Sequence, residues 1–204
     1  MNRSLRRAAS VVAGGAALCL ASAGIASAET PSSEQIAAAV YSAPDASAAF
    51  AALPADQQAV FAARMANWIS DEVASGPAVK REPTVQEQIA MGPAGMAASG
   101  CWTQYQYHTW KDLGIKTGVT WMTANWCSNG SRITSYNIAQ PGGQGYKGIK
   151  YNGTGQKFIN NVGWEVRQAQ QFNFSVVWAT AQPCMQIRGG ATGLHSYRAD
   201  CNLG

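Results

Sequence analysis

The sequence predicts an all-β C-terminal domain, an antiparallel β-sandwich or barrel of about six or more short strands, preceded by a small helical segment. From residue 101 onward, aromatic, valine, threonine and isoleucine runs are separated by Gly, Asn and Pro at short intervals, which is typical of strands joined by tight turns. Strand patterns do not alternate with long helical patterns in this half, so a parallel sheet is not predicted. The same half holds an even number of cysteines, Cys101, Cys127, Cys184 and Cys201. An even number in an exported chain favours two disulfides, and the spacing leaves all three pairings open.

Residues 1–28 are predicted to be a signal peptide. Three arginines precede an apolar stretch that ends in Ala26-Ser27-Ala28, an A-x-A cleavage pattern. The apolar stretch is shorter than the roughly 20 residues that a membrane-spanning helix needs. We therefore expect a secreted, extracellular protein that is cleaved after Ala28 and has no transmembrane segment in its mature chain.

Residues 29–76 form the predicted helical segment. Ser32 and Gln35 match a capping box, and Asp45 matches the N-cap of a second short helix. A third helix is expected from Pro54 to the stop at Gly76-Pro77, because apolar residues recur at helical spacing. This apolar stripe consists of Phe61, Met65, Trp68, Ile69 and Val73.

Residues 77–100 are expected to be a linker, since they carry prolines and small residues without a periodic pattern. Within the linker, Lys80-Arg81 is either a processing site or an ordinary solvated pair. Charge changes sign across this segment. Residues 29–100 hold eight carboxylates and three basic side chains, a net charge of −5, whereas residues 101–204 hold three and nine, a net charge of +6. The two halves therefore attract each other, or the basic half meets an anionic partner.

The stretch WCSNGSRI, residues 126–133, is predicted to be a turn beside a disulfide. Asn129-Gly130 favours a two-residue type I′ hairpin turn, because both positions tolerate the left-handed backbone conformation. That turn would place Trp121 opposite Ile138 and Cys127 opposite Arg132. The expected core face then carries Val119, Trp121, Cys127, Tyr136 and Ile138.

Two more segments alternate as strands do. Residues 101–110 place Trp102, His108 and Trp110 on one side, and residues 172–180 place four apolar side chains, Phe172, Phe174, Val176 and Trp178, on one face. The glycine-rich residues 141–156 between them are expected to form a hairpin or an extended surface loop.

Titratable groups are scarce in the β domain, and we expect the protein not to be an enzyme. Its acids and imidazoles are few and far apart in the sequence: Asp112, Glu165, Asp200, His108 and His195. No G-x-S-x-G elbow, phosphate-binding glycine loop, C-x-x-C pair or acidic calcium loop is present. The sequence therefore predicts no catalytic residue, no metal site and no cofactor.

Aromatic and basic side chains are the remaining candidates for function. Exposed flat rings stack on sugars or on other apolar surfaces, and lysines attract anionic ligands. The candidate ligand-binding residues are Trp102, Trp110, Trp126, Tyr146, Tyr151, Lys147 and Lys150. The alternative for each tryptophan is a place in the core or over a disulfide.

At Gly100–Trp102 and at Trp126–Thr134 the sequence resembles uncharacterised small secreted proteins of actinobacteria, which have a Trp/Gly-rich, disulfide-bonded β domain with a similar Trp-Cys-x-Asn-Gly hairpin. The resemblance implies export and a β fold, and it implies no activity.

The leading hypothesis is a non-enzymatic extracellular binding module whose partner is a carbohydrate, a cell-wall polymer or a protein surface. Nucleic acid is not an expected partner, and the oligomeric state stays open. The alternative is a secreted bacteriocin-like effector or inhibitor whose acidic helical part is a pro-segment.

Overall fold

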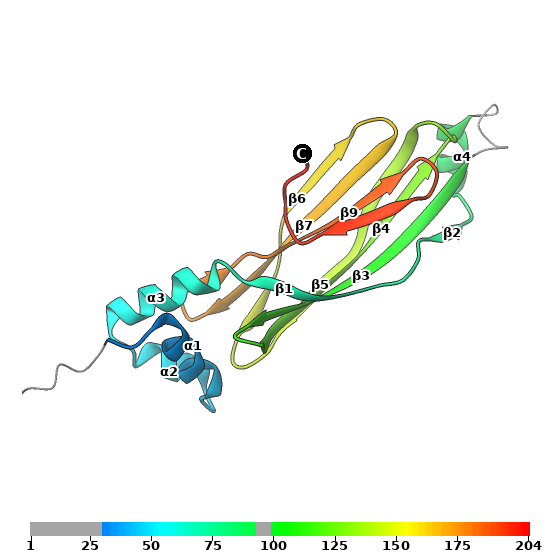
Figure 1. The fold of residues 1–204 in the computed structure, drawn as a ribbon. Helices are drawn as coiled ribbons and strands as arrows, with labels where there is room; N and C mark the ends of the chain where they lie inside the picture. Colours follow the sequence, from blue (N-terminus) through cyan, green and yellow to red (C-terminus); the bar gives the residue numbers. More distant parts are fainter. Residues whose placement is uncertain (1–29, 93–98) are drawn as a thin grey trace, which may run out of the picture. The chain divides into compact units, whose positions relative to one another are not determined.

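Two antiparallel sheets form the β part of the computed structural model, which describes residues 30–92 and 99–204 (Figure 1). The first sheet has the order β1 (Ile69–Ser75), β3 (Gly100–Asp112), β4 (Ile115–Ser128), β5 (Ile133–Gly145), and β2 (Val79–Arg81) also pairs with β3. The second has the order β10 (His195–Arg198), β9 (Cys184–Gly190), β7 (Glu165–Val176), β6 (Lys150–Asn161), and β8 (Ala179–Ala181) pairs with β7. The predicted antiparallel β fold with preceding helices is confirmed. The predicted signal peptide, residues 1–28, lies outside the described residues.

Three helices precede the sheets: α1 (Ser33–Ser42), α2 (Ala46–Ala51) and α3 (Ala55–Met65). The predicted caps are confirmed. Ser32 and Gln35 form a capping box at α1, and the Asp45 side chain accepts a hydrogen bond from the backbone N–H of Ala48 at α2. Pro54 precedes α3 as expected.

The third helix is shorter than its apolar spacing predicts, because the chain after it joins a sheet. Helix α3 ends at Met65, and Ile69–Ser75 pair with β3 as strand β1. Helical spacing therefore continues into a segment that is not helical. Pairing with the edge of β3 satisfies the backbone N–H and C=O groups of this segment through long-range contacts, which local periodicity does not report.

The expected linker is partly ordered structure. Strand β2 pairs with residues Cys101–Thr103, and α4 (Val85–Met91) follows with a capping box between Thr84 and Glu87. The T-x-x-E pattern is a helix-start signal that the sequence analysis overlooked. Residues 93–98 lie outside the described residues.

One core joins the helices to both sheets, and everything described from Pro31 onward belongs to one compact unit. Phe50 and Phe61 of the helices are fully buried with Met122 of the first sheet and Phe174 of the second. Figure 1 shows α1–α3 at one end of the two sheets and α4 at the other. Each helix within residues 30–92 and 99–204 is too short or too polar to cross a membrane.

The β4–β5 hairpin exists, but its predicted turn and register are wrong. Residues 129–132 form a four-residue loop in which the Asn129 Oδ1 accepts from the backbone N–H groups of Ser131 and Arg132. Strand partners are Ala124 with Ile138 and Trp126 with Tyr136. The register differs from the predicted one by an odd number of residues, so Ile138 lies opposite Ala124 and not opposite Trp121. Met122, Ala124 and Trp126 are therefore buried, and Trp121 is only half-buried. Val119, Cys127 and Ile138 are buried as predicted, whereas Tyr136 is 41% exposed.

Two further expectations about the strands are corrected. The glycine-rich segment is not a hairpin, because β5 belongs to the first sheet and β6 to the second, so the chain crosses between sheets at residues 146–149. Trp178 does not continue the buried face of β7. The chain turns at Val177, whose φ is 53°, and Trp178 is 53% exposed.

Candidate functional site

Both disulfides predicted from the four cysteines are present. Cys101 is bonded to Cys127 across the adjacent strands β3 and β4, and Cys184 of β9 is bonded to Cys201 near the C-terminus. These pairings resolve the three alternatives that the spacing left open. Two disulfides are consistent with an extracellular protein.

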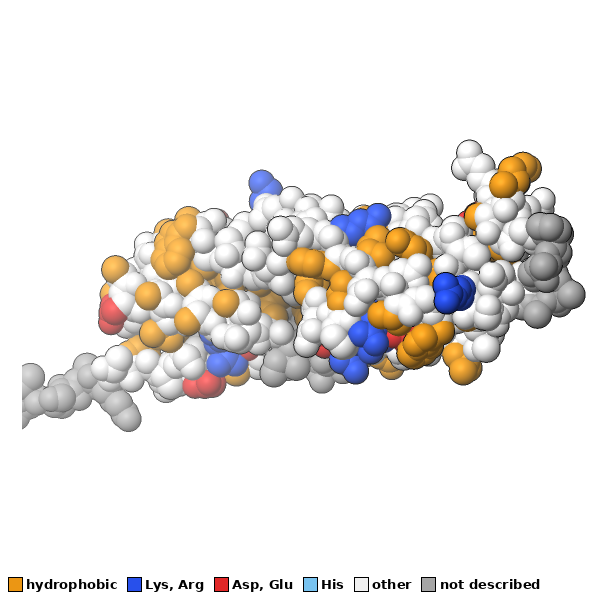
Figure 2. Space-filling model, turned by 90° about the horizontal axis from the view of Figure 1, so that it is seen from above, with side chains coloured by type: hydrophobic (Ala, Val, Ile, Leu, Met, Phe, Trp, Pro, Cys, Tyr) orange, Lys and Arg blue, Asp and Glu red, His pale blue; other side chains and the backbone are white. Residues whose placement is uncertain are grey.

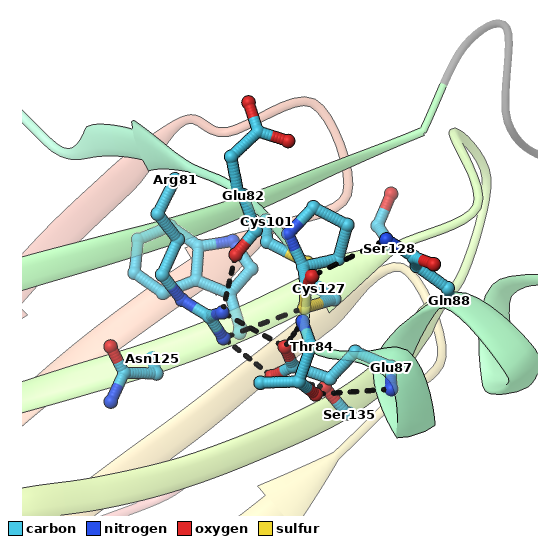
Figure 3. The surroundings of a disulfide bond; sticks show 12 residues. Arg81, Glu82, Thr84, Glu87, Gln88, Cys101, Asn125, Cys127, Ser128 and Ser135 are labelled. Carbon is cyan, nitrogen blue, oxygen red and sulfur yellow. Dashed lines mark hydrogen bonds and ion pairs between the residues drawn. A yellow bond between two sulfur atoms is a disulfide. The ribbon is translucent and has the colours of Figure 1, made fainter.

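Helix α4 lies over the Cys101–Cys127 disulfide (Figure 3). The two guanidinium nitrogens Nη1 and Nη2 of Arg81 donate to the carboxylate of Glu87, and Nη2 also lies 3.6 Å from the Sγ of Cys127. Ser135 of β5 donates a hydrogen bond of 3.4 Å to the same carboxylate. Donor atoms of Glu87, Cys101 and Cys127 come within 4.8 Å of one another. Because both sulfurs belong to the disulfide, the thiolates that zinc prefers are not available here.

The Arg81–Glu87 pair predicts a pH-dependent part of the stability. The Arg81 hydrogen bonds lower the pKa of Glu87 to about 2, from 4.5. A lowered folded-state pKa stabilises the protein above pH 4.5, and this stabilisation is lost as pH falls toward 2. Glu87→Gln is therefore expected to lower the free energy of unfolding by about 2 kcal/mol at pH 7 and by much less at pH 2.5. Urea unfolding at both pH values measures this, with exposed Glu82→Gln as the control. An equal loss at both pH values would contradict the assignment.

Two of the predicted aromatic candidates are buried, which corrects the expectation that they lie on the surface. Trp110 and Trp126 are 1% and 0% exposed. The Nε1 of Trp110 donates to the Oγ1 of Thr120 inside the sandwich. Trp102 is half-buried and stacks on Trp126, with ring centroids 6.1 Å apart. These three tryptophans therefore have the packing role that the sequence analysis gave as the alternative to ligand binding.

The other candidates gather where the chain crosses from β5 to β6. Tyr146 and Tyr151 are half-buried, and Lys147 and Lys150 are exposed. The Tyr151 ring packs against the buried Phe174, and the Nζ of Lys116 lies 4.5 Å from the centroid of the Tyr146 ring. This group borders α2, because the backbone at Gly148 closely approaches Ala46. The structure therefore separates these four residues from Trp102 and Trp126.

At the other end of the sandwich, three loops are hydrogen-bonded into one unit: β4–β5 (129–132), β6–β7 (162–164) and β9–β10 (191–194). The backbone N–H of Ala191 donates to the carbonyl of Trp164 over 2.8 Å, and that of Ile133 donates to the carbonyl of Gly163 over 2.7 Å. The Ser128 hydroxyl donates to the carbonyl of Ala191 over 2.6 Å. Such mutual bonding holds the loops in one arrangement, which lowers the entropy cost of binding a ligand there.

The stacked indoles of Trp102 and Trp126 pack against the β9–β10 hairpin. The Nε1 of Trp126 donates to the carbonyl of Gly190. A Cβ at Gly189 would collide with Trp126, and a Cβ at Gly193 would collide with Trp102. Gly193 also has a φ of 87°, which favours glycine. The β9–β10 hairpin therefore rests directly on the two rings.

A pocket of about 490 Å3 opens between the three loops, within the size range of small-ligand sites. We name it the loop-end pocket. Its polar side chains include Glu165, Arg188 and His195, and its rim carries Trp164 and Leu194, which are 60% and 77% exposed. An exposed ring beside a few polar groups is the arrangement that sugar-binding surfaces need.

A larger hollow of about 670 Å3 lies beside α3 and the β3–β4 turn. Its central charged groups already bind each other, since Arg64 donates to both carboxylate oxygens of Asp112 over 2.6–2.8 Å. The Tyr41 hydroxyl donates to Asp112 as well. This hollow is therefore a structural junction between helices and sheet, and the loop-end pocket is the stronger candidate.

The acids and imidazoles that were weighed for catalysis are distributed over the molecule. Asp112 lies at the helical end, and His108 lies inside the sandwich, where burial lowers its pKa to about 4. Glu165 and His195 both line the loop-end pocket, and Arg167 holds the Glu165 carboxylate at 2.7 Å. The expectation that the protein is not an enzyme stays a prediction.

The sequence analysis missed Trp164 as a candidate, although a local signal marks it. Gly163 has a φ of 92°, and its backbone N–H donates to the Asn161 side chain, so Asn161–Gly163 form a tight turn. A tryptophan directly after such a turn lies at a loop tip, where core packing is scarce. Leu194, directly after the chain reversal at Ala191–Gly193, is exposed for the same reason.

On the face in Figure 2, Lys and Arg side chains are scattered over the strands among small hydrophobic groups, and most visible Asp and Glu lie at the helical end.

Comparison of the chain with protein-family models, with curated proteins and with solved structures finds no match. The resemblance to small secreted actinobacterial proteins therefore stays a prediction.

Proposed function

We propose that the protein is a secreted, non-enzymatic binding module that holds an extracellular carbohydrate or cell-wall polymer in the loop-end pocket. The observation that carries this proposal is Trp164, which is 60% exposed beside an open, mostly apolar pocket that a few polar side chains line. Leaving a large apolar ring in water costs free energy that binding recovers. Flat rings of this kind stack on the apolar faces of sugar rings, and the polar groups bind hydroxyls.

The structure supplies a matched pair of tryptophans for testing this. Trp164 at the loop end and Trp178 at the helical end are 60% and 53% exposed. Pull-downs on insoluble cellulose, chitin and peptidoglycan at low and high salt measure binding. Trp164→Ala is expected to weaken binding about 10-fold or more, since exposed tryptophans dominate binding energies where they contact a ligand. Trp178→Ala is expected to leave binding unchanged.

Two results would contradict the proposal. One is that the wild-type protein binds none of the polymers at either salt concentration. The other is that both tryptophan variants bind as the wild type does, which would remove the loop end from the binding surface. Unchanged melting temperatures in both variants show that each is folded.

The alternative, an effector with an acidic pro-segment, has no comparable support. Cleavage after Arg81 would cut the chain between α1–α3 with β1 and β2 and the remaining strands. Tyr41, Phe50 and Phe61 of the helices are buried in the core that both parts share, so removal of the N-terminal part would expose that core. Arg81, the last residue of β2, forms an ion pair with Glu87 of α4. Mass spectrometry of the exported protein is expected to show a chain that persists from Glu29 and is not cut near Arg81.

A further inference from the structure

Three arginines lie on three adjacent strands of the second sheet, beside the loop-end pocket. Arg167 of β7 is directly opposite Arg188 of β9, and Arg198 lies on the next strand, β10. Like charges on opposed positions destabilise a sheet unless other groups compensate them. Glu165 accepts a hydrogen bond from Arg167, whereas the hydrogen bonds of Arg188 go to the Gln186 side chain and to the Gly204 oxygen.

Arg188 lines the pocket and is largely buried. The residue is 9% exposed, because the C-terminal residues 199–204 cross this face of the sheet and are fixed there by the Cys184–Cys201 disulfide. The Nε of Arg188 donates to the Gln186 side chain, and Nη2 donates to the carbonyl of Gly204. No hydrogen bond from Nη1 is found within the described part of the chain. Arg188 lines the pocket, so this nitrogen of the fixed guanidinium can donate to a ligand there.

The surroundings favour an anionic occupant. Burial, together with the positive charges of Arg198 and Arg167, lowers the pKa of Arg188, and the negative charges of Glu165 and Asp200 offset this only in part. A negative charge in the pocket would offset this repulsion. Glu165 lines the same pocket, and its own negative charge favours a ligand group with a single negative charge over a doubly charged one.

We propose that the loop-end pocket recognises a glycan that carries a carboxylate, with the carboxylate bound by Arg188 and the sugar ring stacked on Trp164. This inference rests on the proposed function and names the substrate class of the same site. Arginine is the side chain best suited to a carboxylate, because its planar donors match the two oxygens and its charge persists when buried. The 60% exposed ring of Trp164 and the hydroxyls of Ser131 and Ser196 in the pocket fit a sugar better than a peptide end.

Blocking the carboxylates of the polymer tests the proposal with the unaltered protein. The carboxylated probes are peptidoglycan and polygalacturonate, each compared with the same polymer after amidation or methyl esterification. Cellulose and chitin are the neutral polymers, and dextran sulfate is the general polyanion. We expect at least one carboxylated polymer to bind, and blocking its carboxylates to weaken binding about 10- to 100-fold, as the loss of a charged hydrogen bond implies.

Arg188→Gln is the matched change in the protein, with Lys150→Gln as its control, because Lys150 is exposed and lies away from the loop end. Arg188→Gln is expected to weaken binding of the native polymer by the same 10- to 100-fold and to leave binding of the blocked polymer unaffected, while Lys150→Gln changes neither. If Arg188→Gln fails to fold, the blocked polymers still decide the question.

The outcomes separate this inference from the proposed function. Binding of cellulose or chitin that depends on Trp164, with no effect of carboxylate blocking, would overturn the inference and leave the proposed function standing. Equal binding of dextran sulfate would overturn it as well, since attraction would then be general. Binding of no polymer at all would overturn both.

Discussion

Replacing Trp126 with alanine is expected to lower the free energy of unfolding by about 3–5 kcal/mol. The side chain is fully buried, it stacks on Trp102, and its Nε1 donates to the carbonyl of Gly190. Truncation removes the packing of a large ring, leaves a cavity between the sheets, and leaves the Gly190 carbonyl without its indole donor. Urea unfolding at pH 7 measures the change.

The same substitution is expected to disturb the loop end, because the β9–β10 hairpin rests on the two indoles. Trp126→Phe is the matched control. It keeps most of the ring packing and loses the hydrogen bond, so it is expected to cost about 1–2 kcal/mol. If the free energy of unfolding of Trp126→Ala were within about 1 kcal/mol of the wild-type value, the prediction would be wrong, and the sheets would have closed over the cavity left by the indole.

Replacing Arg64 with methionine is expected to lower the free energy of unfolding by about 3 kcal/mol. The Asp112 side chain is only 8% exposed, and Arg64 neutralises it through hydrogen bonds from Nε and Nη2. Removing the cation leaves a largely buried carboxylate that still accepts a hydrogen bond from the Tyr41 hydroxyl, 3.1 Å away. An uncompensated buried charge costs more than the ion pair contributes.

A second substitution tests this cause. Asp112→Asn removes the charge and keeps an acceptor for Tyr41, so the double variant Arg64→Met, Asp112→Asn is expected to regain a large part of the loss. The exposed Arg132→Met is the control and is expected to change stability by less than about 0.5 kcal/mol. If the double variant were less stable than Arg64→Met alone, the buried charge would not be the reason for the loss.

The loop-end site illustrates what local sequence patterns leave undetermined. Its walls come from residues near Gly130, Trp164 and Leu194, which lie about thirty residues apart along the chain and meet only because β4, β6, β7, β9 and β10 end at the same edge of the sandwich. Trp164 and Trp126 are the same residue type, yet one is 60% exposed and the other fully buried. Burial depends on which strand lies opposite, and the spacing within one segment does not report that.

By itself, the sequence determined the antiparallel β fold, the caps of α1 and α2, and the presence of two disulfides, because turn residues, side-chain hydrogen bonds at helix starts and cysteine number are local properties. Only the tertiary structure decided the end of α3, the register of β4 with β5, the cysteine pairing and the place of Arg188 in the lining of the loop-end pocket. Each of these depends on backbone and side-chain partners that are distant in the sequence, so long-range pairing and packing select among conformations that local patterns leave equivalent.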